Sequence, residues 1–178
     1  MHDTTLIIRA ASFAAFKHRN QRRKDVDSSP YINHPLGLAR VLSEEGGVTD
    51  AATLCAALLH DTIEDTDTTR EELDREFGSE ITALVLEVTD DKSLPKADRK
   101  LAQIHHAAHI SDKAKLVKLA DKICNLRDVA NTPPSDWTLE RRREYFDWAK
   151  QVIDNLRGVD AKLEAVFDVV YQLKPRTW

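Results

Sequence analysis

Apolar residues recur at helical spacing along most of the chain, and no stretch alternates with the two-residue period of a strand. Between Leu6 and Phe16 this spacing marks an amphipathic helix that leads into segment 17–27, whose charges predict an exposed basic loop. A second helix is expected to begin at His34, because Pro35 suits a first helical turn and apolar positions follow until a pair of glycines. The pattern therefore predicts an all-α protein.

The most apolar segment, 51–59, carries hydrophobic residues on nearly every side, so we expect a buried central helix. Asp50 is in position to cap its first turn, and the helix is expected to end near His60. Capping signals and periodicity predict further helices over 69–77, with a capping box from Thr69 to Glu72, and over 79–88, 115–129, 138–156 and 160–173.

The composition narrows the class of protein. Hydrophobic residues make up 42% and charged residues 31%, with 5 glycines and 6 prolines, which predicts a single globular domain over residues 1–178. The net charge of -4 argues against broad nucleic-acid binding, and the absence of long apolar runs argues against secretion and membrane spanning. Cys55 and Cys124 lie within apolar segments and predict reduced core thiols, hence a cytoplasmic protein.

The segment from His60 to Asp65 places several polar and ionisable residues where a strongly apolar helix ends. Such groups are costly beside a core unless something binds them, and a metal ion would do so. Neighbouring helical residues point about 100° apart, so His60 and Asp61 can share one ion only where the helix frays or another helix approaches. Further ligands must therefore come from elsewhere in the chain.

Two other residues are candidate ligands. Asp121 lies between Val117 and Cys124 on a largely apolar helical stripe, where an unpaired carboxylate would be costly. His34 offers an imidazole from the start of its helix. Together with His60 and Asp61 they form a nitrogen and oxygen donor set that suits manganese, iron or zinc.

The order of these four residues, H…HD…D, resembles that of the HD superfamily of metal-dependent phosphohydrolases. Longer segments resemble the hydrolase domains of the SpoT/Rel alarmone enzymes, and the match to their small single-domain members, the metazoan SpoT homologues and bacterial counterparts, covers nearly the whole chain. The segments that carry this resemblance are Arg22-Arg23-Lys24-Asp25, Pro30-Tyr31-Ile32-Asn33-His34-Pro35, His60-Asp61-Thr62-Ile63-Glu64-Asp65-Thr66, Thr89-Asp90-Asp91-Lys92, Lys118 to Arg127, and Tyr145-Phe146-Asp147-Trp148-Ala149.

The resemblance implies a compact helical HD domain, with roughly eight to ten helices around a single metal site. It also implies Mn²⁺, with Zn²⁺ as the alternative, and removal of the 3′-pyrophosphate of the stringent-response alarmone ppGpp, or of pppGpp. The expected products are pyrophosphate and GDP or GTP. The expected partner is therefore a small nucleotide, with no nucleic acid or membrane; the oligomeric state is not indicated.

The roles of individual residues follow partly from spacing and partly from the resemblance. Glu64 and Asp65 lie four residues after His60 and Asp61, so a continuous helix would project them toward the metal as an acid/base pair. If the helix breaks at Asp61, only the resemblance supports this assignment. The expected substrate contacts are a basic pair suited to phosphates, an asparagine one turn beyond Asp121, and residues able to stack on a purine: Arg23, Lys24, Asn125, Tyr31, Trp137, Arg141 and Tyr145.

Each assignment has a structural alternative. The four ligands could be ordinary helix caps and satisfied core polar groups, the acidic pair a surface turn, the basic clusters solvated loops, and the aromatic residues core packing. His105, His106 and His109 form a rival metal cluster, since His105 and His109 have i,i+4 spacing, and HD phosphodiesterases recruit extra histidines here. We expect these three to lie on a surface segment, because the glutamate of an H-E-x-x-H motif is missing.

Other functions remain open from sequence. The same phosphate-binding metal site would suit removal of the 2′-phosphate of NADPH, an activity associated with an animal member of the small family. A generic HD nucleotidase or cyclic-dinucleotide phosphodiesterase is disfavoured by the Arg-Lys and His-Asp-Thr-Ile-Glu-Asp-Thr segments. A non-catalytic nucleotide sensor would be expected to have lost a metal ligand or the Glu64-Asp65 pair, and all of these are present.

Overall fold

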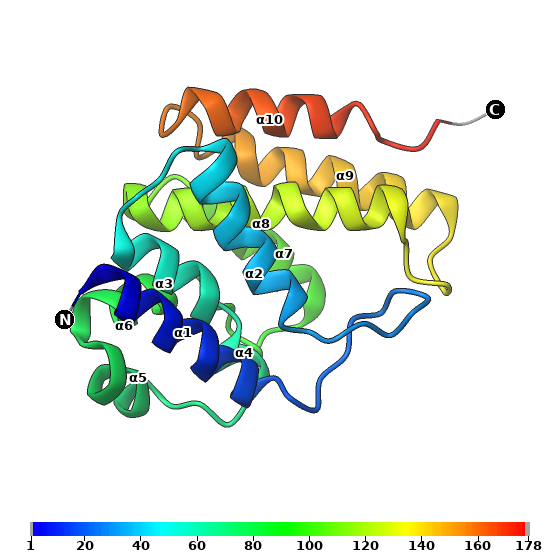
Figure 1. Ribbon diagram of the computed structural model, residues 1–178. Coiled ribbons are helices and arrows are strands. Elements are labelled where there is room, and N and C mark those ends of the chain that lie inside the picture. Colours follow the sequence, from blue (N-terminus) through cyan, green and yellow to red (C-terminus); the bar gives the residue numbers. More distant parts are fainter. Residues whose placement is uncertain (1, 177–178) are drawn as a thin grey trace.

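The computed structural model describes residues 2–176 as a succession of helices, labelled α1 to α10 with one π-helical segment η1 (Figure 1). Their bounds are α1 Asp3–Lys17, α2 Asn33–Arg40, η1 Val41–Glu45, α3 Ala51–Leu59, α4 Thr62–Asp65, α5 Arg70–Phe77, α6 Ser79–Val88, α7 Lys96–His106, α8 Asp112–Asn131, α9 Leu139–Asp154 and α10 Ala161–Tyr171. Among these residues, the pairing of extended backbone is limited to one isolated bridge, between Arg22 and Pro30. The all-α prediction is confirmed.

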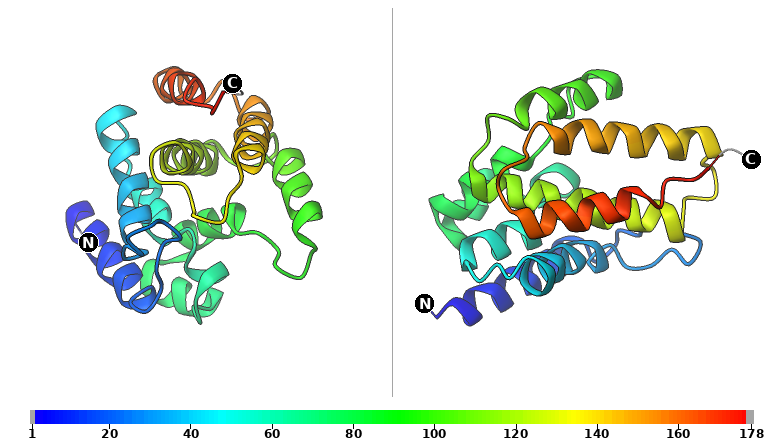
Figure 2. Two further views of the ribbon diagram at one scale, coloured as in Figure 1. Left: turned by 90° about the vertical axis from the view of Figure 1, so that its right-hand side faces the viewer. Right: turned by 90° about the horizontal axis from the view of Figure 1, so that it is seen from above.

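Helix α8 runs through the middle of the molecule. It packs against α2, α3 and α6 on one side and against α9 and α10 on the other, as the three views show (Figures 1 and 2). Its buried face includes Leu119, Ile123 and Leu126, and α3 is buried along almost its whole length. The two helices with the most central positions are therefore those that carry Asp121 and lead into His60.

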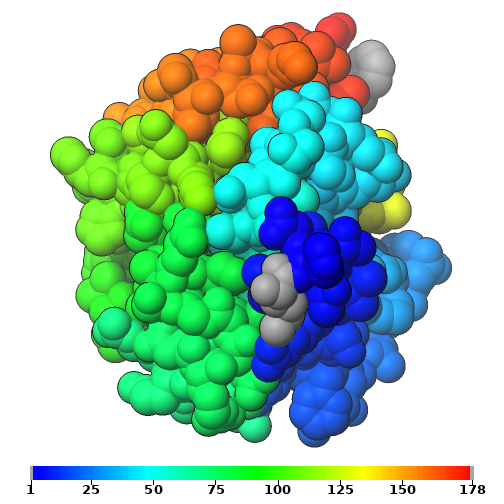
Figure 3. Space-filling model, turned by 60° about the vertical axis from the view of Figure 1, so that its left-hand side comes forward, coloured from blue at the N-terminus to red at the C-terminus, as the bar shows by residue number. Residues whose placement is uncertain are grey.

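Helix α1 covers α3 from outside. In the space-filling view it lies at the surface between the α5 and α6 region and the α2 region (Figure 3). Phe13 and Phe77 meet edge to face with ring centroids 5.3 Å apart, and Arg9 pairs with Glu76, so α1 is fastened to α5. This cover keeps α3 away from solvent, as its apolar sequence requires.

Two helix caps were predicted from sequence, one at Asp50 and one at Thr69, and both N-cap residues accept the expected backbone hydrogen bond. The Asp50 carboxylate accepts a hydrogen bond from the backbone N–H of Thr53 at 2.8 Å, which confirms the predicted cap of α3. The predicted capping box forms only in part. Thr69 accepts from the Glu72 N–H at 3.2 Å, but the Glu72 carboxylate pairs with Lys17 at 2.8 Å instead of reaching back to Thr69.

The prediction of an exposed basic loop over 17–27 is wrong at its start. Lys17 pairs with Glu72 and Asp67, and His18 is only 2% exposed, with its ring against that of Tyr31. The predicted core thiols are confirmed, since Cys55 and Cys124 are both buried and unpaired. Within the described part of the chain, no helix is long and apolar enough to cross a lipid bilayer.

Candidate active site

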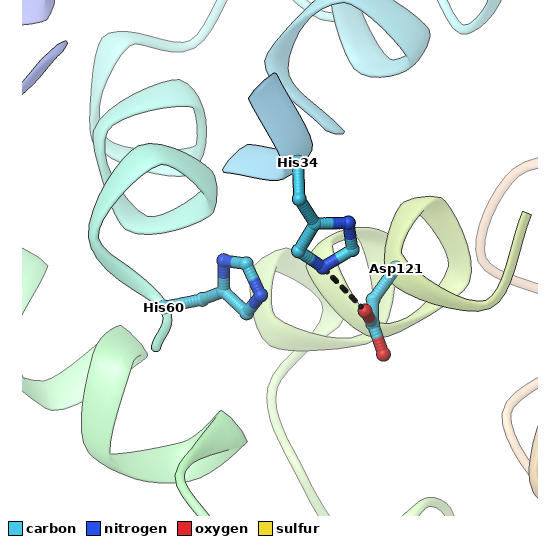
Figure 4. Close-up of side chains that lie close together, drawn as sticks. All are labelled: His34, His60 and Asp121. Atoms are coloured by element: carbon cyan, nitrogen blue, oxygen red, sulfur yellow. Dashed lines mark ion pairs between the residues drawn. The ribbon is translucent and has the colours of Figure 1, made fainter. Parts of the chain in front are cut away.

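Three of the predicted metal ligands meet at one point. His34 comes from the first turn of α2, His60 from the end of α3, and Asp121 from the middle of α8 (Figure 4). One potential ligand atom from each residue lies within 4.8 Å of the others, and His34 Nε2 is 3.3 Å from Asp121 Oδ1. Both imidazoles are buried. Helix packing thus gathers donors that lie 26 to 87 residues apart in the sequence.

The geometry of His60 tests whether a cation fits this cluster. Its Nδ1 lies 2.8 Å from the carbonyl oxygen of Ala57, which can only accept, so Nδ1 carries the proton. In the neutral ring Nε2 then bears a lone pair, and it is buried without a hydrogen-bond partner in the described structure, 2.9 Å from Asp61 Oδ2. A lone pair that faces a carboxylate requires a cation between them, so the donor set fits a metal ion.

Asp61, the fourth predicted ligand, lies at the edge of the cluster. Its carboxylate is 2.9 Å from His60 Nε2 and 4.0 Å from His34 Nε2. The hydroxyl of Tyr31 donates a hydrogen bond to the same carboxylate, and burial together with the Asp61 charge raises the pKa of Tyr31. Tyr31 was predicted to contact substrate; the structure places its hydroxyl on Asp61.

The cluster favours cations in the absence of metal. Burial opposes a charge on His60, but the Asp61 and Asp121 carboxylates outweigh it and raise the pKa of His60 to about 9. Burial likewise opposes ionisation of Asp121, yet Lys122 and the two histidines hold its pKa well below the usual range. A positive charge at His60 Nε2, a proton or a metal ion, is therefore stabilised.

Two neighbours in α8 orient Asp121. The ammonium of Lys122 lies 2.9 Å from Asp121 Oδ2, and the amide of Asn125 donates to Oδ1 at 2.6 Å. Asn125 was predicted to contact substrate, whereas Lys122 was missed by sequence reasoning. Lys122 is only 3% exposed and lies over the ring of Trp148 at 4.4 Å. A lysine on an apolar helical stripe beside Asp121 was the available signal.

The backbone breaks between the metal cluster and the predicted acid/base pair. Helix α3 ends at Leu59, and α4 starts again at Thr62, so the helix is not continuous as the spacing argument assumed. The Asp65 N–H still donates to the Asp61 carbonyl at 2.8 Å, which keeps Asp61 and Asp65 one helical turn apart. For His60 and Glu64 the i,i+4 argument is wrong, because the turn at residues 60–61 interrupts the helix before α4 begins.

Glu64 and Asp65 nevertheless both line the cavity beside the metal cluster. Burial and the charges of Asp90 and Asp61 raise the pKa of Glu64, while the backbone N–H of Asp90 donates to its carboxylate at 3.2 Å. Lys92 donates to Asp65. A carboxyl group with a raised pKa next to a polar cavity is suited to hold and transfer a proton.

The cavity beside the cluster measures about 220 Å³ and is lined by His34, His60, Asp61, Asp121 and further polar groups. Sequence reasoning gave no role to several of these groups, among them Lys118 and Asp90. Lys118 donates to the carbonyl of Val88 at 2.8 Å, and its ammonium is 3.7 Å from Asp90. Both residues lie within segments that carry the family resemblance, which gave neither of them a role.

A second, more apolar cavity of about 340 Å³ adjoins the first. Its lining includes the predicted contacts Arg23, Lys24, Tyr31, Asn125, Trp137 and Tyr145. Five residues line both cavities: Arg23, Tyr31, Asp65, Asn125 and Tyr145. The Arg23 guanidinium pairs with Asp128 and lies over the Tyr31 ring, so its charge is partly neutralised within the protein.

A third cavity of about 320 Å³ shares Trp137 and Tyr145 with the second. It contains the predicted contact Arg141, which stacks on Trp137 at 4.5 Å, and two missed lysines, Lys96 and Lys100. Burial and the neighbouring Lys96 charge lower the pKa of Lys100. Lysines on a short amphipathic helix gave no sequence signal of their own.

The rival histidine cluster does not assemble. His105 and His106 end α7, His109 follows it, and all three are exposed. Within residues 2–176, the ligand atoms that gather for a metal come from His34, His60 and Asp121. The prediction of a surface segment is confirmed.

Comparisons with known proteins agree with this geometry. The HD-domain family profile matches residues 10–147. A Xenopus tropicalis protein named guanosine-3′,5′-bis(diphosphate) 3′-pyrophosphohydrolase MESH1 is 57% identical to this chain. The alignment covers 95% of this chain and 94% of the relative. The Homo sapiens protein of that name is 52% identical over 96% of each chain.

A solved structure gives the same result for the fold. It belongs to a metazoan ortholog of SpoT described as a protein that "hydrolyzes ppGpp and plays a role in starvation responses". Its TM-score is 0.91 at 51% identity, and the alignment covers 94% of each chain. The chain belongs to the HD-domain family and, within it, to the group of MESH1 proteins.

Proposed function

We propose that this protein hydrolyses ppGpp, and also pppGpp, at the 3′-diphosphate to release pyrophosphate and GDP or GTP. The observation that carries the proposal is the match, over nearly the whole chain, to relatives named for this reaction. The three adjoining cavities support it, because they offer in succession a carboxylate and histidine cluster, an aromatic surface, and a surface where Lys96, Lys100 and Arg141 outnumber Glu140 and Glu144. We extend the proposal to residues 1–178 acting as one domain in the cytoplasm.

The proposed metal ligands are His34, His60, Asp61 and Asp121, and the proposed ion is Mn²⁺, with Zn²⁺ as the alternative. When bound, such an ion polarises a phosphoryl group and acidifies water beside it. Tyr31, Lys122 and Asn125 keep the two aspartates in place through the contacts described above.

The proposed substrate lies across all three cavities. Its 3′-diphosphate faces the metal cluster, its guanine stacks among Tyr31, Trp137 and Tyr145, and its 5′-diphosphate faces Lys96, Lys100 and Arg141. Aromatic rings bind any base through stacking, and lysine and arginine bind phosphate oxygens through charge-assisted hydrogen bonds. The order of polar, apolar and basic linings supports this orientation.

Glu64 and Asp65 are the proposed acid/base pair. One carboxylate takes a proton from water as the water oxygen bonds to the phosphorus next to the 3′-oxygen. The bond between phosphorus and the 3′-oxygen breaks, and that oxygen receives a proton as GDP leaves. The raised pKa of Glu64, caused by burial and by Asp90 and Asp61, suits the group that must hold a proton.

The same cavities favour one competing substrate. NADPH also joins a 5′-pyrophosphate to a nucleoside, and its 2′-phosphate lies on the same edge of the ribose as a 3′-group. The basic cavity at Lys96 and Lys100 therefore fits both molecules. A cyclic dinucleotide has no terminal 5′-phosphate to occupy this cavity.

The deciding experiment measures Mn²⁺-dependent pyrophosphate release from ppGpp beside phosphate release from NADPH. Two controls are used: chelator-treated protein, which lacks the metal, and Asp61→Ala, which lacks a proposed ligand. Metal-dependent pyrophosphate release that Asp61→Ala abolishes is the expected result. Release from NADPH alone would replace the proposal with a 2′-phosphatase, and turnover of neither substrate would reject both.

A further inference from the structure

A second buried histidine lies close to the active site without belonging to the metal cluster. His18 directly follows α1 and is 2% exposed. Its ring lies against the ring of Tyr31, with centroids 4.7 Å apart and planes inclined at 32°. His18 is neither a proposed metal ligand nor a proposed acid/base residue.

The hydrogen bonds around Gln21 determine which nitrogen of His18 carries a proton. The Asp65 carboxylate only accepts hydrogen bonds when ionised, so the Gln21 amide nitrogen, 3.1 Å from Asp65 Oδ2, donates to it. The Gln21 amide oxygen therefore faces His18 Nδ1, at 2.6 Å, and must accept. His18 Nε2 is buried and unpartnered in residues 2–176, which matches a neutral ring protonated at Nδ1.

The backbone of the same segment reaches the other side of the site. The carbonyl of Gln21 accepts from the Tyr31 N–H at 3.2 Å, and the Gln21 N–H donates to the His18 carbonyl at 2.9 Å. The Tyr31 hydroxyl in turn donates to Asp61. One short segment thus holds Asp65 through a side chain and Asp61 through Tyr31.

We propose that His18 and Gln21 are positioning residues that orient the Asp65 carboxylate toward the cavity. His18 fixes the amide of Gln21 in the one orientation that presents N–H to Asp65. Without His18, the amide is free to rotate and to present its oxygen, which would repel the carboxylate. The inference rests on the proposed function, because it concerns the proposed acid/base pair.

Matched variants separate positioning from general support of the fold. Gln21→Leu and His18→Leu remove the donors, and each is expected to lower kcat for ppGpp about 10- to 100-fold while KM stays near the wild-type value. His18→Asn keeps an N–H donor near the position of Nδ1 and is expected to recover most of the lost kcat. Arg19→Leu is the control, since Arg19 is exposed, lies outside the cavities and donates only to the Phe16 carbonyl.

A double-mutant comparison shows whether Gln21 acts through Asp65. In an Asp65→Asn background, Gln21→Leu is expected to cost no further activity. An equal loss in both backgrounds, a loss confined to KM, or failure of His18→Asn to recover more kcat than His18→Leu would overturn the inference. Full activity of Asp65→Asn would also overturn it, because Asp65 would then have no role to support.

A measurement without substrate keeps the inference testable if ppGpp is not turned over. Nitrogen-15 NMR of the metal-free protein is expected to show His18 protonated at Nδ1, with a slowly exchanging proton that Gln21→Leu abolishes. Protonation at Nε2 would overturn the inference whatever the substrate is. If the protein does not hydrolyse ppGpp but gives the expected spectrum, the proposed function is rejected. The hydrogen bonds from His18 through Gln21 to Asp65 are then still supported.

Discussion

Replacing Lys122 with methionine is expected to destabilise the metal-free protein strongly. The ammonium of Lys122 lies 2.9 Å from Asp121 Oδ2, and the two side chains are 3% and 14% exposed. Methionine keeps the apolar stem against Trp148 but leaves the buried Asp121 carboxylate without its cation. Removing one partner of a buried ion pair costs about 3–5 kcal/mol. The remaining contacts of Asp121 with Asn125 and His34 place the expected loss near the lower value.

The loss translates into a measurable shift of the unfolding temperature. For a chain of this size, 1 kcal/mol corresponds to roughly 2–4 °C, so about 3 kcal/mol lowers Tm by roughly 6–12 °C. Mn²⁺ at 100 times its Kd stabilises the wild type by about 2.7 kcal/mol. The shift on adding Mn²⁺ is expected to be larger in Lys122→Met, because the ion supplies the positive charge that Asp121 has lost.

Thermal unfolding with chelator and with Mn²⁺ is the assay. Lys150→Met is the matched control, because Lys150 pairs with Asp154 at the surface and such pairs contribute about 0.3–0.5 kcal/mol. The reasoning would be refuted if Lys122→Met and Lys150→Met melted at the same temperature in chelator. Equal Mn²⁺-induced shifts in Lys122→Met and wild type would refute the claim that Lys122 and the metal serve the same carboxylate.

Three further predictions concern the site. Asp90→Asn keeps the backbone donor to Glu64 but removes a charge that, after burial, raises the Glu64 pKa. The alkaline limb of the kcat/KM profile, which reports the group that must hold a proton, should therefore move to lower pH; an unchanged limb would exclude Glu64 as its origin. Because the pKa of His60 is raised to about 9, a proton competes with the metal, and calorimetry should show Mn²⁺ affinity rising with pH until about 9 and then levelling. Lys100→Met should raise KM for ppGpp and leave kcat nearly unchanged, since Lys100 lines the third cavity and Glu64 lines the first; a selective loss of kcat would contradict that position.

The raised pKa of His60 also makes the folding stability of the metal-free protein depend on pH. Its folded pKa lies above its unfolded value, so the stabilisation by Asp61 and Asp121 is present below about pH 6.5 and is lost as pH rises through about 9. This applies to the metal-free protein, because a bound ion replaces the proton. Chelator-treated protein should therefore lose this contribution in the alkaline range.

Sequence reasoning predicted most of the long helices but not α7, because a helix is encoded by residues three and four positions apart and α7 has no buried residues to mark that spacing. The apolar run 51–59, the cap at Asp50 and the glycine stop after Phe77 depend on such local spacing, and each was found where predicted. The order of His34, His60, Asp61 and Asp121 is also visible in the sequence. The family resemblance that it carries predicts metal-dependent phosphohydrolysis without any knowledge of the distances between these residues.

The tertiary structure alone decided how those residues meet. Helix α3 ends at Leu59 and α4 begins at Thr62 without a glycine or proline between them, so local spacing could not exclude a continuous helix through Glu64. Lys100 and Gln21 reach their cavities from helices and loops distant in sequence, and no periodic pattern marks them. A helix needs only neighbours along the chain, whereas a cavity is made by side chains of several helices at once, and the sequence by itself does not contain the distances between those helices.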